Sequence, residues 1–151
     1  VFEDEDVAIH ELGNGKIKAG DIVVLRMMGP VGGPGTVFAC SFMAALAGAG
    51  LADTVSVVTD GELSGLNRGI TIGQVMPEAA CGGPLAIVEE GDAIKIDLND
   101  RKIDLLIPDK EYATRLGNWN KRERKLPNNW LKFYVDNVMP IEQGAVFGKR
   151  N

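Results

Sequence analysis

One serine stands where an apolar run of the chain enters a glycine-rich turn. Residues 55–59 are mostly β-branched, and the turn that follows them is Asp60-Gly61-Glu62-Leu63-Ser64-Gly65. A buried strand that ends in such a turn places the turn's side chains at the carboxyl edge of a sheet, where ligands of α/β proteins usually bind. An unassisted serine hydroxyl is a poor base, because its alkoxide must be stabilised by metal ions or fixed dipoles. Taken alone, the residues favour a serine that hydrogen-bonds the backbone of its turn.

A second glycine-rich segment follows the apolar run 22–27. It reads Gly29-Pro30-Val31-Gly32-Gly33-Pro34-Gly35, here called the glycine-proline loop. Its prolines lack backbone donors and its glycines permit unusual dihedral angles, so we predict a tight turn that faces a ligand. A P-loop needs lysine and then serine or threonine after its last glycine, but Thr36-Val37 stands there, and GxGxxG is not matched. The loop therefore offers backbone N–H groups to an anion without a nucleotide-binding motif.

The elements that position these two segments follow from residue patterns. We predict strands over 22–27, 55–59 and 70–75, and a short helix over 6–12 that the turn Gly13-Asn14-Gly15 closes. Another helix is expected from Val37 to Leu46, with Thr36 as its cap and with a packed face formed by Phe38, Phe42 and Leu46.

The second half of the chain predicts a compact β-layer followed by helices. Three short strands are expected over 85–88, 93–97 and 102–107, and residues 77–80 have the form of a helical first turn. Helices are expected over 110–116, where Gly117 ends the first, and over 130–137, where Trp130, Phe133 and Tyr134 would lie in the core. Residues 140–151 are predicted to be a tail or a docking strand. The order of elements indicates one α/β domain with a mixed sheet.

Length and composition exclude several classes of protein. The chain has 151 residues, of which 45% are hydrophobic and 25% charged, as in an ordinary globular domain. No apolar run approaches the roughly 18 residues of a membrane span, and no signal peptide is visible. The formal charge of −5 argues against a nucleic-acid surface. The basic run 121–125 is interrupted by Glu123, which favours a solvated face over a binding patch.

The two cysteines carry no metal-binding or disulfide pattern. Cys40 and Cys81 lack CxxC spacing, so the sequence supports neither a zinc site nor a disulfide framework, and we expect a reducing cytoplasm. The chain starts at Val1 without methionine, which suggests a piece of a longer protein.

Four motifs in a fixed order now indicate a family. They are the glycine-proline loop, the turn 60–65, Pro77-Glu78-Ala79-Ala80 with Gly82-Gly83-Pro84, and Glu90-Gly91-Asp92. This series resembles the C-terminal domain of the dihydroxy-acid and sugar-acid dehydratases, a family that includes phosphogluconate dehydratase. The resemblance covers the chain from about Asp21 to Asp97.

The resemblance implies a fold and partners. It implies an α/β swivelling-type domain, with a mixed, barrel-like β-layer and flanking helices, that caps a larger N-terminal domain. Residues 1–151 would then be a single domain and the C-terminal part of a longer chain. The N-terminal domain would supply an iron-sulfur cluster and most of a magnesium site. A cytoplasmic homodimer with no nucleic-acid or membrane partner is expected.

The resemblance also implies a reaction. A hydro-lyase of amino-acid biosynthesis or sugar-acid metabolism would convert a 2,3-dihydroxy carboxylic acid, either a dihydroxy acid or an aldonic acid, to a 2-keto acid. Ser64 matches the serine that removes the proton beside the carboxylate, and the cluster iron would assist departure of the 3-hydroxyl. The 151 residues alone would be inactive. The substrate-binding positions would be Gly32, Gly33, Gly61 and Gly65.

One position departs from the family pattern. Family members commonly continue the glycine-proline loop with a glutamate that binds magnesium, but Phe38 stands there, and a phenyl ring cannot ligate this hard cation. We therefore assign no metal ligand to this chain. Either water and the N-terminal domain complete a magnesium site that binds more weakly, or the metal is absent and Phe38 is a pocket wall or a core residue. Cys40 and Cys81 are not assigned to the cluster. The competing class is a divergent, non-catalytic binding or structural module of the same fold.

Overall fold

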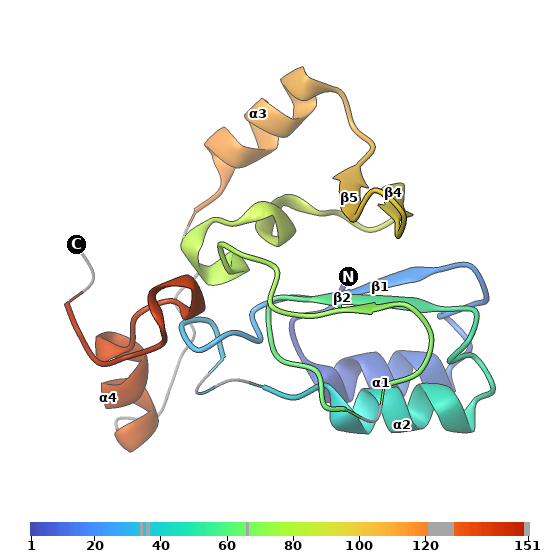
Figure 1. Cartoon of the computed structure of the whole chain (residues 1–151), viewed down its shortest axis with the longest axis horizontal. Helices are drawn as coiled ribbons and strands as arrows, with labels where there is room; N and C mark the ends of the chain where they lie inside the picture. Colours follow the sequence, from blue (N-terminus) through green and yellow to red (C-terminus); the bar gives the residue numbers. More distant parts are fainter. Residues whose placement is uncertain (34, 36, 66, 121–128, 150–151) are drawn as a thin grey trace.

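Three parallel strands form the centre of the fold (Figure 1). They lie in the order β1 (Ile22–Leu25), β2 (Ser56–Thr59) and β3 (Thr71–Ile72), and the register pairs Val24 with Val58. The predicted strands are thus confirmed, although the third is shorter than expected. The computed structural model describes residues 1–33, 35, 37–65, 67–120 and 129–149.

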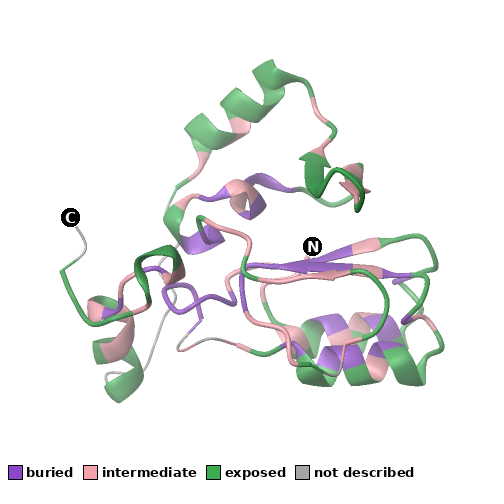
Figure 2. Ribbon diagram, viewed as in Figure 1, coloured by how far each residue is buried: buried purple, intermediate pink, exposed green. Residues whose placement is uncertain are grey.

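Both faces of this sheet are buried, which explains why its strands read as continuous apolar runs (Figure 2). Helices α1 (Glu5–Gly13) and α2 (Cys40–Gly48) lie side by side against one face. Successive strand side chains alternate between the two faces. One core cluster includes Val23, Leu25 and Val57 with residues of both helices, and the other includes Val24, Val58, Ala79, Leu85 and Val88.

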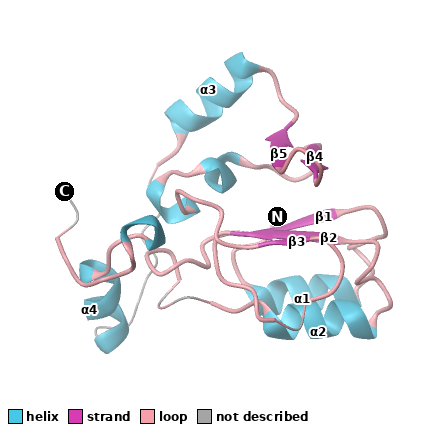
Figure 3. Cartoon of the chain, viewed as in Figure 1, coloured by secondary structure: helices cyan, strands magenta, loops and turns pink. Residues whose placement is uncertain are grey.

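The second face is covered by short 3-10 helices and a hairpin, and α3 (Asp109–Asn118) lies beyond them, in contact with the 3-10 segment (Figure 3). The hairpin pairs β4 (Ile94–Asp97) with β5 (Lys102–Leu105) in antiparallel fashion. The 3-10 helices are η1 (Ala79–Cys81) and η2 (Pro84–Ile87). The predicted strand over 85–88 is therefore wrong, because proline fixes a helical φ angle at the first position of η2.

The α/β class is confirmed, but the sheet is not mixed. Parallel and antiparallel pairings occur in separate sheets, one of three strands and one of two. The strands in the described part of the chain do not close into a barrel, so a barrel-like β-layer stays a prediction. None of the described helices has the length and apolarity to span a membrane.

Two predicted helix boundaries are wrong. Helix α2 begins at Cys40 with Ala39 as its N-cap residue, so Phe38 precedes the helix and is 51% exposed instead of packed. The chain is extended at Phe38 because it pairs with Glu62. Helix α3 continues through Gly117 to Asn118. The proposed cap, Thr36, and the basic run 121–125 lie outside the described residues.

Helix α4 (Trp130–Asn137) has the predicted bounds but not the predicted burial. Trp130 is 64% and Phe133 51% exposed, so the prediction that they lie in the core is wrong. Their rings pack on each other and on Phe147, with centroids 5.1–6.2 Å apart. The C-terminal segment includes η3 (Ile141–Gln143) and folds back on α4 through a bridge between Val138 and Phe147.

Candidate functional site

The two glycine-rich segments meet beyond the carboxyl ends of β1 and β2. Phe38, which follows the glycine-proline loop, forms an isolated parallel bridge with Glu62 of the turn. The Glu62 N–H donates to the Val37 carbonyl at 3.2 Å, and the Ala39 N–H donates to the Glu62 carbonyl at 3.4 Å. The structure therefore brings together the two motifs that were expected to carry the chemistry, at the sheet edge where α/β proteins bind ligands.

Ser64 lies two residues beyond this bridge and is half-buried. Its hydroxyl makes no hydrogen bond with any residue that the structure describes. A backbone hydrogen bond from the Ser64 hydroxyl to the described residues of its own turn, 60–65, is therefore not present. Beside the turn lies a shallow hollow of about 450 Å³, in which the Gln74 amide donates to Glu62 Oε1 at 3.0 Å. The hollow is lined by Glu62, Leu63, Asn67, Thr71, Gly73 and Gln74.

The four glycines expected to contact substrate have different surroundings. Gly32, Gly33 and Gly61 are buried, whereas Gly65 is exposed and a Cβ there would meet nothing within 4 Å. At Gly61 a Cβ would come within 2.6 Å of Met28 Cβ and 2.7 Å of the Val37 carbonyl oxygen. Close packing within the chain is therefore sufficient reason for glycine at this position. Contact between these four glycines and substrate stays a prediction.

Asp60 holds three chain segments together. This carboxylate is fully buried and accepts N–H groups from Met27 at 3.1 Å, Met28 at 2.9 Å and Ala79 at 2.8 Å. Burial raises the pKa of Asp60, and the three backbone hydrogen bonds oppose that rise. Met27 has a φ of 64°, an uncommon conformation for a residue with a side chain, and its bond to Asp60 helps to hold it. The expected structural role of Asp60 fits this geometry.

Glu78 is a second fully buried carboxyl group, and sequence reasoning missed it. Its Oε2 accepts the N–H groups of Val31 at 3.0 Å and Gly32 at 3.2 Å. Burial is the main reason that the pKa of Glu78 rises to about 7, and the nearby negative charge of Asp60 adds to this. The motif 77–80 predicts a helical first turn and is one of the four family motifs, but neither interpretation assigns a role to Glu78. The sequence feature that could have pointed to Glu78 is one acidic residue within a short segment of proline and alanines.

The raised pKa of Glu78 predicts a pH-dependent stability. Folded Glu78 keeps its proton up to about pH 7, whereas the unfolded chain loses it near pH 4.5. The free energy of unfolding should therefore fall between these pH values, by on the order of 3 kcal/mol, and then level off. Urea unfolding at pH 5 and pH 8 measures the change, and Glu78→Gln should remove most of it. An equal pH dependence in both proteins would assign the effect to other groups, such as Asp60.

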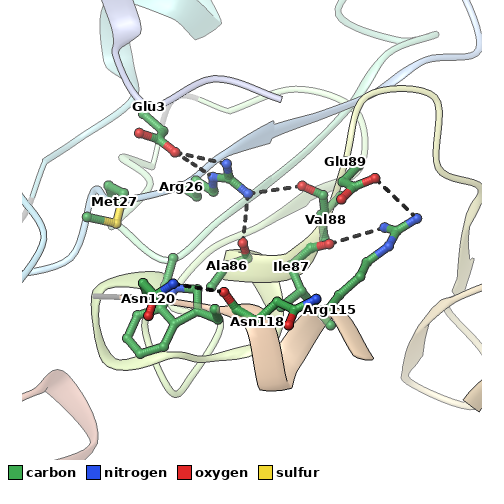
Figure 4. Close-up of a pocket in the computed structure, with 12 residues that line it drawn as sticks. Glu3, Arg26, Met27, Ala86, Ile87, Val88, Glu89, Arg115, Asn118 and Asn120 are labelled. Carbon is green, nitrogen blue, oxygen red and sulfur yellow. Dashed lines mark hydrogen bonds and ion pairs between the residues drawn. The ribbon is translucent and has the colours of Figure 1, made fainter. Parts of the chain in front are cut away.

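A different pocket, of about 430 Å³, lies between the sheet and α3 (Figure 4). None of the predicted site residues lines it. Arg26 pairs with Glu3 at 2.9 Å and donates to the carbonyls of Ala86 and Val88. Arg115 pairs with Asp92 at 2.6 Å. Both guanidinium groups already have acidic partners, which disfavours anion binding in the pocket. Their contacts instead link α3 and η2 to the sheet.

The described residues do not form a donor set for a metal or a cluster. No three His, Cys, Asp or Glu side chains in the described ranges lie close enough together to hold an ion. Cys40 in α2 and Cys81 in η1 are exposed and lie on separate elements. Phe38 offers no oxygen ligand. The chain as described therefore does not form a complete cofactor site.

Comparisons with known proteins indicate the same family as the four ordered motifs. The family described as dihydroxy-acid/6-phosphogluconate dehydratase C-terminal matches residues 1–145. The dihydroxy-acid dehydratase of Lachnospira eligens is 46% identical over 146 residues, and that of Aquifex aeolicus is 41% identical over 145 residues. These alignments cover 97% and 96% of this chain but 26% of each relative. The chain thus spans about a quarter of the length of the curated relatives that it matches.

Proposed function

The chain belongs to the family of dihydroxy-acid/6-phosphogluconate dehydratase C-terminal domains, and from this premise we propose that it serves as the C-terminal part of a hydro-lyase. The reaction would convert a 2,3-dihydroxy carboxylic acid to a 2-keto acid with loss of water. The observation that best supports the proposal is the position of Ser64, half-buried beyond the carboxyl end of β2 and two residues after the bridge between Phe38 and Glu62.

In this proposal Ser64 reacts as its alkoxide, which takes the proton from the carbon beside the substrate carboxylate and becomes a neutral hydroxyl. Its hydroxyl is not engaged by the described residues, and the carboxyl-edge position suits a group that meets a ligand. Gly65 is exposed next to it, so its backbone can approach substrate without a side chain between them. Gly32, Gly33 and Gly61 would shape the wall behind it.

The remaining chemistry is assigned to the rest of the longer polypeptide. An iron-sulfur cluster and magnesium, both implied by the family resemblance, would supply Lewis acidity for loss of the 3-hydroxyl. The partners in the proposal are the N-terminal domain, the hydroxy-acid substrate and a second copy of the chain in a cytoplasmic homodimer. A relative named dihydroxy-acid dehydratase makes a dihydroxy acid the first substrate to test.

The proposal is tested with the full-length protein encoded by the natural reading frame. The assay measures 2-keto acid formation from a panel of dihydroxy acids and aldonic acids under anaerobic conditions. We expect turnover of at least one of these acids. A frame of only about 151 residues, or a full-length protein that turns over none of them, would favour the non-catalytic module.

The 151 residues alone are expected to fold but not to catalyse the reaction. Two buried core clusters on the faces of one sheet predict a single cooperative thermal transition. The lack of a complete donor set in the described residues predicts no dehydratase activity. Calorimetry and the 2-keto acid assay check the two parts separately. Turnover by metal-free protein of this length would contradict the assignment of cofactors to the N-terminal domain.

Phe38→Glu is expected to strengthen magnesium binding in the full-length protein. Phe38 pairs directly with Glu62, so the substitution would place two carboxylates on neighbouring backbone positions. Like charges in such a pair repel each other, and a divalent cation would relieve the repulsion. Melting temperature and metal content, measured with and without magnesium, should show a larger stabilisation in Phe38→Glu than in wild type. Tight stoichiometric magnesium in the wild type would show that other ligands complete the site.

A further inference from the structure

The carboxyl group of Glu78 is in direct contact with the glycine-proline loop. Glu78 Oε2 accepts the N–H groups of Val31 and Gly32. A Cβ added at Gly29 would lie 2.4 Å from this oxygen and 2.8 Å from the carboxyl carbon. Any residue other than glycine at position 29 would therefore push the carboxyl group away from the two N–H groups that it binds.

The residues on either side of the same loop, Met28 and Val37, are in contact with the turn that carries Ser64. The Val37 N–H donates to the Met28 carbonyl at 3.0 Å, and the Val37 carbonyl accepts from Glu62. Gly61 packs within van der Waals contact of Met28, where no Cβ would fit. A shift of residues 29–33 would thus be passed through Met28 and Val37 to the turn that contains Ser64.

The acidity of Glu78 is not needed for these contacts. Oε1 is buried and has no hydrogen-bond partner among the described residues, so the two N–H groups use one oxygen only. The ionisable groups that influence Glu78 or feel its charge are Asp60 after β2, Glu142 in η3 and Tyr134 in α4, and none of them is a cation. A glutamine side chain could supply the same acceptor oxygen without a charge.

We propose that Glu78 is a positioning residue, whose buried carboxyl group fixes the glycine-proline loop against the Ser64 turn so that substrate and hydroxyl meet in reactive geometry. This proposal rests on the proposed function. It assigns to Glu78 no contact with substrate and no proton transfer.

Steady-state kinetics of the full-length enzyme test the proposal through three variants. Glu78→Ala should lower kcat/KM by about 10²-fold, because a misplacement of about 1 Å at a reacting group has that effect. Glu78→Gln should stay close to wild type, since its amide oxygen keeps the loop in place. Val55→Ala removes core volume at the opposite end of β2, so it should lower the melting temperature and leave kcat and KM unchanged. A purely structural Glu78 would make Glu78→Ala behave like Val55→Ala.

Hydrogen exchange gives a second readout that does not depend on turnover. The Val31 and Gly32 amides should exchange faster in Glu78→Ala than in wild type, but not in Glu78→Gln, as measured by mass spectrometry on peptides that cover residues 28–33. If the wild-type enzyme has no dehydratase activity, the proposed function fails, and this readout still decides whether Glu78 holds the loop. Unchanged exchange in Glu78→Ala would overturn the positioning role.

Gly29→Ala tests the same contact from the loop if Glu78→Ala does not fold. Its Cβ should displace the carboxyl group and lower kcat/KM, whereas Gly13→Ala, where a Cβ meets nothing within 4 Å, should have no effect on kcat/KM. Wild-type kcat/KM in Gly29→Ala would contradict the proposal. A Glu78→Gln enzyme as slow as Glu78→Ala would also contradict the proposal, because it would show that the carboxyl proton itself is required.

Discussion

Ser64→Ala in the full-length protein is expected to lower kcat by a factor of about 10² to 10⁴, the usual contribution of a general base. The hydroxyl is half-buried at the carboxyl edge of the sheet and makes no bond within the described structure that its removal would break. The free energy of unfolding should therefore change by no more than about 0.5 kcal/mol, as is usual for a surface substitution. A large loss of kcat with unchanged stability would be the signature of a catalytic group.

Ser56→Ala is the matched control for this experiment. Ser56 begins the same strand, at the end opposite the turn, and is also half-buried. Its replacement should leave kcat and KM at wild-type values. The 2-keto acid assay with both variants, together with urea unfolding, separates catalysis from stability. Wild-type turnover by Ser64→Ala would end the assignment of Ser64 as the base.

The central part of the fold could be predicted because its signals are local. Continuous β-branched runs identify buried parallel strands, and helix α1 has a side-chain cap at Asp4 and a glycine turn after it. The glycine-rich turn after residues 55–59 placed Ser64 at the carboxyl edge without any knowledge of strand order. The ordered motifs then indicated the family.

Other features depend on contacts between distant residues, and sequence patterns do not contain them. Phe38 has helical spacing with Phe42, but pairing with Glu62 holds it in an extended conformation before α2. Trp130 and Phe133 have the composition of a core, but they pack on Phe147 instead of the sheet. The role of Glu78 depends on a loop 46 residues away. None of these contacts produces a periodic pattern.

Asp60 is expected to have the largest effect on stability of any single residue in the site. Asp60→Ala would leave the N–H groups of Met27, Met28 and Ala79 without their acceptor. Each unpaired buried group costs about 1 to 3 kcal/mol, so a loss of about 5 kcal/mol is expected. The whole stability of a domain of this size is about 5 to 15 kcal/mol, and the variant should therefore be close to unfolded.

Asp60→Asn is the more informative substitution, because it keeps the shape of the side chain and removes one acceptor atom. Oδ1 accepts from Met28 and Oδ2 from Met27 and Ala79, so an amide NH₂ on either side would face backbone donors. We expect a loss of about 2 to 3 kcal/mol, less than in Asp60→Ala. Asp53→Asn, at an exposed position, should have no measurable effect in the same urea unfolding experiment. An Asp60→Asn protein of wild-type stability that had lost turnover would instead make Asp60 a second catalytic base, since only its ability to accept a proton would then have been removed.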